Sequence, residues 1–303
     1  MSQSQHAVTG ERLIPEAQHG QLVHAEHLVR YRLAARLAGS RRVLDIACGE
    51  GYGSAMLAAA GATSVVGVDV DARTVELAAS RYPDARYACA DIGALPFDDG
   101  AFELVASFET IEHVREPERA LDELARVTAP GGLLVISTPN KRSYLVENEF
   151  HEREFTSEEF LDLLADRFPK VQPVLQHNWN TSLILGPEAA RDAGGERTHA
   201  VELGKVVGIE PGEELYTLAL CSSVEPPEVV PLGIAASVDE AHELAQRLRT
   251  AEGEVVRWHN AYEKQAAILA DLDAQLGAVY ASVWWRATAP LQRAVDKARR
   301  RLG

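Results

Sequence analysis

Apolar positions along this chain recur at two alternating periods. Short runs rich in Val, Ile and Leu, typical of buried strands, are followed by stretches whose apolar residues lie three and four positions apart, as on one face of a helix. Strands that alternate with helices form a parallel sheet covered on both faces, so we expect a doubly wound, mostly parallel α/β fold. The pattern predicts helices over 22–38, 53–60, 72–80, 116–128 and 155–168, and strands over 43–47, 64–69, 86–89, 102–107, 132–137, 170–176 and 214–222.

A different pattern follows the prolines at 226, 227 and 231. Twelve positions between 241 and 279 alternate three and four residues apart, and eleven of them are apolar or aromatic. This is the seam of a coiled coil, with a length of about 57 Å. A helix of this kind needs a partner, so we expect a homo-oligomer. The alternative is a helix folded back on its own domain.

The end of the chain, SVWWRATAPLQRAVDKARRRLG, places two tryptophans before a cluster of Arg and Lys. This combination favours an amphipathic helix on an anionic membrane surface or in the groove of a protein partner. The alternative is a helix packed against the coiled coil. The predicted domains are 1–38 (an N-terminal lid segment and helix), 39–225 (the α/β domain), 226–236 (a proline-rich linker), 237–281 (the coiled-coil helix) and 282–303 (the basic amphipathic tail).

Charge and cysteine content restrict the class of protein. The formal net charge of −15 repels phosphate backbones, which argues against broad nucleic-acid binding. The three cysteines show no metal-ligand spacing. The N-terminus has no apolar signal segment, and no run approaches the roughly 18 apolar residues of a membrane span. We therefore expect a soluble, cytoplasmic protein that meets the inner membrane face at most peripherally.

The sequence VLDIACGEGYG, from Val43 to Gly53, lies where the first predicted strand turns into a helix. Glycines allow a ligand to approach the backbone closely, and a helix N-terminus favours a negative group. A dinucleotide site requires a third glycine where this chain has Ser54. The run instead resembles the D-x-G-x-G-x-G motif of class I S-adenosylmethionine-dependent methyltransferases, with Ala47 in place of the first glycine.

Further segments resemble the same family in the same order. Asp69 ends the second predicted strand, where an acid accepts hydrogen bonds from ribose hydroxyls. Asp91 resembles the acid that receives the adenine amino group, and FELVASFETIEHV and RVTAPGGLLVISTPN resemble the later strand motifs. The resemblance covers about residues 22–225 and implies a Rossmann-like fold that binds S-adenosylmethionine and releases S-adenosylhomocysteine. The cofactor-binding residues it implies are Asp45, Ala47, Cys48, Gly49, Gly51, Asp69, Val70, Asp91, Ile92, Phe108 and Tyr31.

The helix before the first strand covers the cofactor in many members of this family. His27, Arg30 and Tyr31 lie on it and are candidates to contact the cofactor carboxylate. The alternative is a solvated Arg30 and a Tyr31 that packs on the sheet.

Methyl transfer requires alignment of donor and acceptor and, for some acceptors, a base. Glu109, Glu112 and His113 follow the fourth predicted strand at positions i, i+3 and i+4, so a helical turn there places all three on one side. His151 follows the fifth main predicted strand. These four residues are the candidate catalytic groups, and we expect a histidine to act as the base.

The pattern E-x-x-E-H with a later histidine also resembles the metal site of small-RNA 2′-O-methyltransferases. In that reading Glu109, Glu112, His113 and His151 hold a divalent ion. The sequence E-H-V is equally frequent in metal-free relatives, such as the ubiquinone-biosynthesis O-methyltransferases. Because this chain is also acidic, we expect no metal.

The tail resembles the ending of bacterial surface-polysaccharide glycosyltransferases and methyltransferases. We therefore expect O-methylation of a sugar hydroxyl in a cell-envelope glycan or its precursor, with an envelope-biosynthesis protein as a candidate partner. Three alternatives stay open. They are methylation of a small aromatic or quinone-like metabolite, a non-catalytic coiled-coil scaffold, and a metal-dependent RNA 2′-O-methyltransferase.

Overall fold

The structure, a computed structural model, describes residues 21–144, 148, 150–192, 199, 201–236 and 239–302. Most of the expected lid segment, residues 1–20, lies outside the described residues. The chain divides into two compact units, Met1–Ser237 and Val238–Gly303. Each unit is described by itself.

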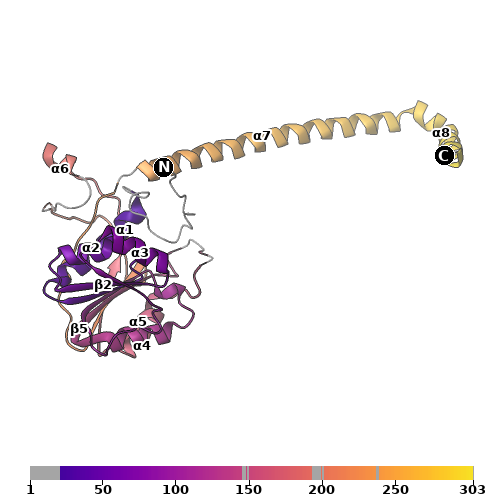
Figure 1. Cartoon of the computed structure of the whole chain (residues 1–303). Coiled ribbons are helices and arrows are strands. Elements are labelled where there is room, and N and C mark those ends of the chain that lie inside the picture. The colour runs from indigo at the N-terminus through magenta and orange to yellow at the C-terminus, as the bar shows by residue number, and fades with distance from the viewer. Residues whose placement is uncertain are drawn as a thin grey trace. The chain divides into compact units, whose positions relative to one another are not determined.

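Seven strands form one sheet in the order β3-β2-β1-β4-β5-β7-β6 (Figure 1). The first five strands are parallel, and β7 is antiparallel to both of its neighbours, β5 and β6. The strand order reverses between β1 and β4, which is where open α/β sheets bind ligands. The strands are β1 Arg42–Ile46, β2 Ser64–Asp69, β3 Arg86–Cys89, β4 Phe102–Phe108, β5 Thr128–Pro139, β6 Lys170–Gln176 and β7 Tyr216–Ser222.

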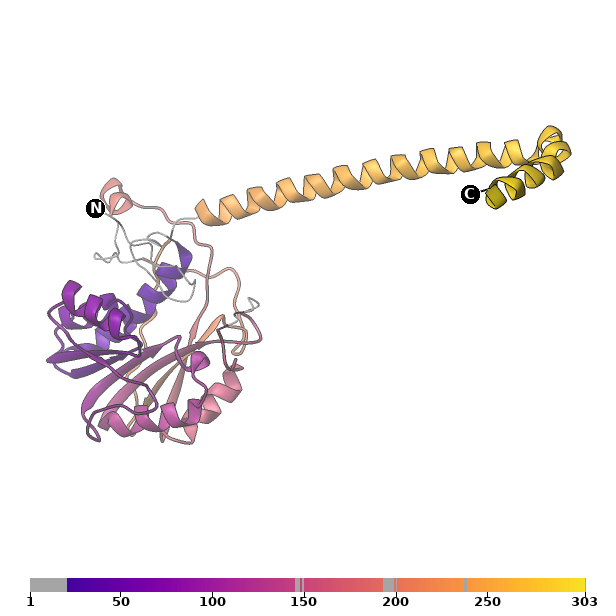
Figure 2. The same ribbon diagram turned by 45° about the vertical axis from the view of Figure 1, so that its right-hand side comes forward.

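Helices cover both faces of this sheet (Figures 1 and 2). The helices α1, α2 and α3 lie on one face and α4 and α5 on the other, so the expected mostly parallel α/β architecture is confirmed. The helices of this unit are α1 Leu22–Ala38, α2 Tyr52–Ala59, α3 Ala72–Arg81, the 3₁₀ turn η1 Ile111–His113, α4 Pro117–Val127, α5 Ser157–Ala165 and α6 Pro187–Arg191.

Alternation along the strands builds two hydrophobic cores. In β1, Val43 packs into the core shared with α1 and α2, and Leu44 packs into the core shared with α4 and α5. Both side chains are fully buried, because a central parallel strand is covered on both faces. The sheet is thereby held rigidly between its helices, and the ends of its strands have fixed positions.

The helix starts follow the sequence signals. Thr156 caps α5: its hydroxyl accepts the Glu159 N–H, and the Glu159 carboxylate accepts the Thr156 N–H, as the capping-box pattern predicts. Pro117 stands in the first turn of α4, where its missing N–H costs no hydrogen bond. The element ends differ most at β5, which begins at Thr128 rather than at 132.

The second unit contains two helices, α7 Asp239–Ala281 and α8 Val283–Leu302. Along the described part of α7, apolar side chains such as Leu248, Trp258, Leu269 and Leu272 are exposed. Among the described residues no single helix is long and apolar enough to cross a membrane; the bent pair Gln246–Ala281 and Arg286–Arg301 meets that length and composition only when taken together. The coiled coil stays a prediction.

Candidate functional site

A bend between β1 and α2 places small residues at three alternate positions in left-handed backbone conformations. Ala47 has φ 53°, Gly49 φ 55° and Gly51 φ 90°. The left-handed region costs a residue with a Cβ about 1 to 2 kcal/mol and a glycine almost nothing. Ala47 therefore adopts the backbone conformation that the glycine of the family motif takes without strain.

Beneath this bend, Asp45 is fully buried and holds two other elements in place. The Tyr31 hydroxyl of α1 donates to Asp45 Oδ1 at 3.0 Å, and the Ser54 hydroxyl of α2 donates to Oδ2 at 2.6 Å. Burial raises the pKa of Asp45 to about 7, although both hydrogen bonds act in the opposite direction. Asp45 thus supports the bend from below, with its carboxylate directed at Tyr31 and Ser54.

Tyr31 is 5% exposed and packs edge-on against two rings, Tyr52 and Phe108. A Cβ on Gly53 would lie 2.1 Å from the Tyr31 ring, so α1 approaches α2 this closely only because residue 53 is glycine. Phe108, at the end of β4, is buried in the same contact. Tyr31 and Phe108 are therefore brought together on the α1 side of the bend.

Asp69, at the end of β2, ties the bend to the neighbouring strand. Its Oδ2 accepts the Gly49 N–H at 3.1 Å, and its Oδ1 accepts the Asp71 N–H at 3.0 Å. These two bonds fix the Asp69 carboxylate at the end of β2, beside the bend. Val70 follows directly and is 72% exposed, an apolar surface beside the acid.

The remaining residues implied for the cofactor lie around the same strand ends. Asp91 is exposed after β3 and accepts the Gly93 N–H at 2.7 Å, and Ile92 beside it packs against the core of the α4 face. Cys48 is buried inside the bend. The structure therefore gathers the implied residues at the carboxyl ends of β1, β2, β3 and β4.

The expected helical turn that places Glu109, Glu112 and His113 on one side is wrong. Glu109 has a left-handed φ of 49°, and only Ile111–His113 form a 3₁₀ turn. The Ser137 hydroxyl of β5 donates to Glu109 Oε1 at 2.6 Å and accepts the Glu109 N–H at 3.2 Å. This clamp holds the strained backbone at Glu109, and the turn that bears Glu112 and His113 begins only at Ile111.

Arg30 is buried rather than solvated, contrary to one of the two readings of the sequence. It donates to Gln176 Oε1 at 2.7 Å, lies 3.7 Å from Glu109 Oε2, and stacks 4.3 Å above the centre of the Tyr216 ring. His27, on the same helix, has a pKa lowered to about 3, because it is buried and faces Arg30. A cation therefore lies beside Glu109, inside the fold.

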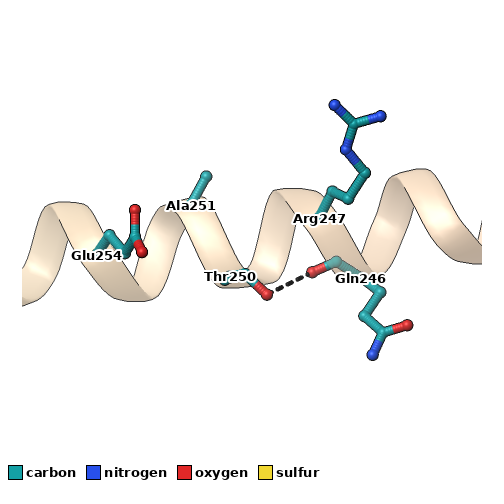
Figure 3. Close-up of a pocket in the computed structure, with 5 residues that line it drawn as sticks. All are labelled: Gln246, Arg247, Thr250, Ala251 and Glu254. Atoms are coloured by element: carbon teal, nitrogen blue, oxygen red, sulfur yellow. Dashed lines mark hydrogen bonds between the residues drawn. The ribbon is translucent and has the colours of Figure 1, made fainter.

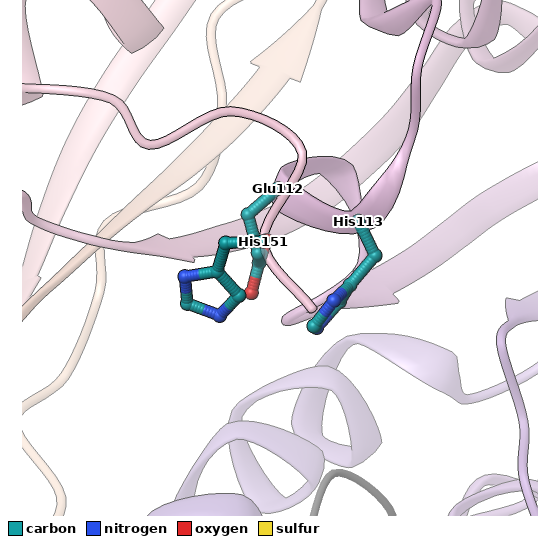
Figure 4. Close-up of side chains that lie close together, drawn as sticks. All are labelled: Glu112, His113 and His151. Carbon is teal, nitrogen blue, oxygen red and sulfur yellow. The ribbon is translucent and has the colours of Figure 1, made fainter. Parts of the chain in front are cut away.

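Glu112, His113 and His151 come together at the end of the η1 turn (Figure 4). One potential ligand atom from each lies within 4.8 Å of the others, and the two imidazole rings meet edge-on with centres 4.9 Å apart. Burial, reinforced by the Glu109 carboxylate, raises the pKa of Glu112 well above its usual value. Burial and the nearby His113 lower the pKa of His151, which favours a neutral ring that can accept a proton.

The sequence did not point to a polar network between α1 and the last two strands. Glu26 of α1 accepts hydrogen bonds from the Tyr216 hydroxyl at 2.9 Å and from the Asn178 side chain, and the Gln176 side chain donates to the Glu26 backbone at 3.2 Å. Glu26 is 8% exposed. The one signal of this network in the sequence was an acid, Glu26, at a position of α1 that faces the core.

A shallow depression along α7 offers no comparable site (Figure 3). Its five lining residues all lie on one helix and point in different directions, so their polar groups do not converge. They are Gln246, Arg247, Thr250, Ala251 and Glu254. The chemistry of the described residues is concentrated instead at the strand ends of the sheet.

This chain is similar in sequence to methyltransferases. The family described as "Methyltransferase domain" matches residues 44–136. A probable S-adenosylmethionine-dependent methyltransferase of Mycobacterium tuberculosis is 37% identical over 164 residues, which cover 52% of this chain and 60% of that protein. One of Mycolicibacterium smegmatis is 37% identical over 174 residues, or 55% of this chain and 67% of that protein. A demethylmenaquinone methyltransferase of Renibacterium salmoninarum is 40% identical over 97 residues, or 32% of this chain and 40% of that protein.

Proposed function

The chain belongs to the S-adenosylmethionine-dependent methyltransferases, and on that premise we propose that it transfers a methyl group from this cofactor to a sugar hydroxyl of a cell-envelope glycan or its precursor. The match spans 60% of the length of the relative from M. tuberculosis, so the activity of the whole protein is part of the proposal. The observation that supports it best is the left-handed bend at Gly49 and Gly51, tied to Asp69 at the switch point of the sheet.

The residues present fit the cofactor. Among the described residues, no atom outside residues 48–50 lies within 4 Å of the position that a Cβ on Gly49 would take, so these residues leave space open beside the backbone of the bend. The Asp69 carboxylate offers acceptors for ribose hydroxyls, and the exposed Val70 offers an apolar surface for a flat ring. After β3, Asp91 offers a carboxylate acceptor and Ile92 an apolar side chain.

When bound, S-adenosylmethionine supplies an electrophilic methyl group on sulfur. The chain's own part is to hold the acceptor in line with that methyl group and, for a hydroxyl acceptor, to take its proton. His151 is our candidate base, because burial lowers the pKa of its ring and keeps it neutral near pH 7. Glu109 lies near it, and Ser137 and Arg30 hold Glu109 in position.

Polar side chains around the ends of β4 to β7 support a hydroxylated acceptor. Glu26, Arg30, Glu109, Gln176 and Tyr216 supply hydrogen-bonding groups beneath α1. Carboxylates and amides recognise hydroxyl groups, whereas a quinone ring requires an apolar surface. The second candidate, a quinone-like metabolite, is supported by the similarity to the demethylmenaquinone methyltransferase.

The test has two stages. Titration calorimetry of the full chain with S-adenosylhomocysteine is expected to show one site, and Asp69→Ala is expected to weaken it by at least tenfold. Methyl transfer from labelled S-adenosylmethionine is then compared on nucleotide sugars, lipid-linked glycans and demethylmenaquinone. Label in the glycan fractions supports the proposal. Label only in the quinone selects the second candidate, and no cofactor binding contradicts both and supports the scaffold reading.

A further inference from the structure

We propose that Glu112, His113 and His151 form a binding site for a divalent transition-metal ion. The site goes beyond cofactor binding, which uses the bend at Gly49 and none of these three residues. It shares His151 with the proposed function: a ring that holds an ion cannot also take the acceptor's proton, so the bound ion would replace His151 in that step by lowering the pKa of the acceptor hydroxyl. The sequence led us to expect no metal. What changes that expectation is the three-dimensional arrangement, which brings two imidazoles and one buried carboxylate together and leaves Glu109 outside the cluster (Figure 4).

Glu112 has a buried carboxylate oxygen without a hydrogen-bond partner in the described structure. Glu112 is 1% exposed, and its Oε2 accepts a hydrogen bond from the Thr138 hydroxyl at 3.0 Å. Its other oxygen, Oε1, is buried and has no hydrogen-bond partner in the described structure. A buried carboxylate oxygen without a partner is strongly unfavourable, and native structures rarely contain one unless a water or an ion satisfies it.

Both histidine rings have a nitrogen suited to bind an ion. His113 Nδ1 lies 3.1 Å from the backbone oxygen of Phe150. Because a carbonyl oxygen can only accept, His113 Nδ1 carries the hydrogen and Nε2 carries the lone pair. Metal-bound histidines are typically held in this way, by a second hydrogen bond from the other ring nitrogen. The buried Nδ1 of His151 has no hydrogen-bond partner in the described structure, with Glu154 Oε1 at 3.5 Å as a neighbouring carboxylate oxygen.

Hydrogen bonds fix the loop that bears His151 to the turn that bears Glu112. The backbone N–H groups of Glu152 and Arg153 both donate to the Glu112 backbone oxygen, at 2.9 and 3.1 Å. The two parts of the cluster therefore keep their separation without an ion. Ligand atoms around a metal with bonds of about 2.1 Å lie about 3 to 4 Å apart, so the side chains need to close by roughly 1 Å.

The donor set restricts the ion. Two imidazole nitrogens with one carboxylate oxygen suit Zn²⁺, Mn²⁺, Fe²⁺ or Co²⁺, whereas Mg²⁺ and Ca²⁺ prefer sites made of oxygen alone. Three protein ligands leave at least one coordination position open. An open position beside the strand ends would bind an oxygen of the acceptor, which links this ion to substrate binding rather than to the stability of the fold.

The test uses the untagged full chain after removal of metals with a chelator. Titration calorimetry with Mn²⁺ and with Zn²⁺ is expected to show one ion per chain. His151→Ala and Glu112→Gln are each expected to weaken binding by at least tenfold, since each removes one of three ligands. His199→Ala is the matched control, because His199 is exposed and pairs with Asp192. Its affinity is expected to stay unchanged.

Pulsed electron paramagnetic resonance of the Mn²⁺-loaded wild type keeps the proposal testable if a variant fails to fold. Coupling to two imidazole nitrogens is expected. An ion without nitrogen coupling, less than one ion per chain, or affinity unaffected by both substitutions would overturn the site. Binding of S-adenosylhomocysteine to the metal-free chain is measured in parallel, so that failure of this site is distinguished from failure of the proposed function.

Discussion

Asp45 shows how one buried side chain can fix the elements around a site. The family resemblance placed it among the cofactor-binding residues, and its position at the end of β1 agrees with that. Its two oxygens are occupied by Tyr31 and Ser54, and the side chain is fully buried. The sequence pattern predicts its place along the chain, but its burial and partners depend on Tyr31 of α1, 14 residues before it, and on Ser54 of α2.

The buried carboxyl of Asp45 predicts a particular pH dependence of stability. Its pKa rises from 3.8 to about 7 on folding, mainly because of burial. The folded state therefore holds this proton more tightly than the unfolded state, so the stabilisation is fully present below pH 4 and is lost as the pH rises to 7. Relative to Asp45→Asn, the wild type should lose about 1.4 kcal/mol per pH unit across that range.

Urea unfolding of both proteins at pH 5, 6, 7 and 8 measures this difference. Asp98→Asn serves as a control for the substitution itself, because Asp98 is exposed and a surface change of this kind alters stability by about 0.5 kcal/mol or less. A free-energy difference between wild type and Asp45→Asn that stays constant from pH 5 to 7 would contradict the raised pKa.

Residues whose roles depend on distant partners were the hardest to predict. The sequence allowed two positions for Arg30, one exposed to solvent and one in contact with the cofactor. In the structure Arg30 is buried and contacts Gln176 of β6 and Tyr216 of β7. Glu109 was expected to share a helical turn with Glu112, and the hydroxyl of Ser137 holds it in a left-handed conformation instead. Both outcomes depend on strand pairings that a local pattern does not encode.

At the scale of elements, periodicity was sufficient for most of the fold. Each strand of the sheet unit, and each of its helices except α6 and the η1 turn, coincides with a predicted segment, because each carries an apolar pattern of one period. The periodicity did not predict that β7 is antiparallel to its neighbours. Its antiparallel place between β5 and β6 follows from long connections on both sides, whose course has no periodic signal.

The contact between α1 and α2 predicts the effect of adding a single methyl group. In Gly53→Ala the new Cβ would lie 2.1 Å from the Tyr31 ring, so the ring must move and its hydrogen bond to Asp45 must lengthen. Overpacking of this kind costs about 1 to 3 kcal/mol. Thermal unfolding should show a melting temperature lower by several degrees.

Gly39→Ala is the matched control for that substitution. Gly39 has a φ of −51°, and the nearest atom to its added Cβ would be 3.9 Å away. Its melting temperature is expected to stay within about 2 °C of the wild type. Equal losses in the two variants would show that the α1–α2 contact is looser than the structure indicates.

At the scale of the whole molecule, the exposed apolar side chains of α7 are the main unsatisfied feature. Leu269 is 64% exposed and Leu272 48% exposed, and both lie on the predicted seam. We propose that a second copy of this helix covers them, with knobs from each helix packed into the other. The unit division at residue 237 places this helix outside the sheet unit.

Leu269→Asp tests the oligomer. A charge in the seam must lose its water on association, so the oligomer is expected to dissociate to monomers in light scattering coupled to gel filtration. Ala270→Asp is the matched control, because residue 270 lies beside the seam on the outer side of the helix and is expected to leave the mass unchanged. An unchanged mass for Leu269→Asp, or a monomeric wild type, would contradict the coiled coil.

The ties of α1 limit how acceptor specificity can be redesigned or can diverge in evolution. Tyr31 joins this one helix to the bend at Asp45, and Glu26 and Arg30 join it to β6 and β7. Selection for a new acceptor that shifts α1 will therefore alter the affinity for the methyl donor at the same time. Variants that change one property alone should arise at strand ends whose described hydrogen bonds do not involve α1, such as Asn140, which donates to the backbone oxygens of Gly212 and Glu214.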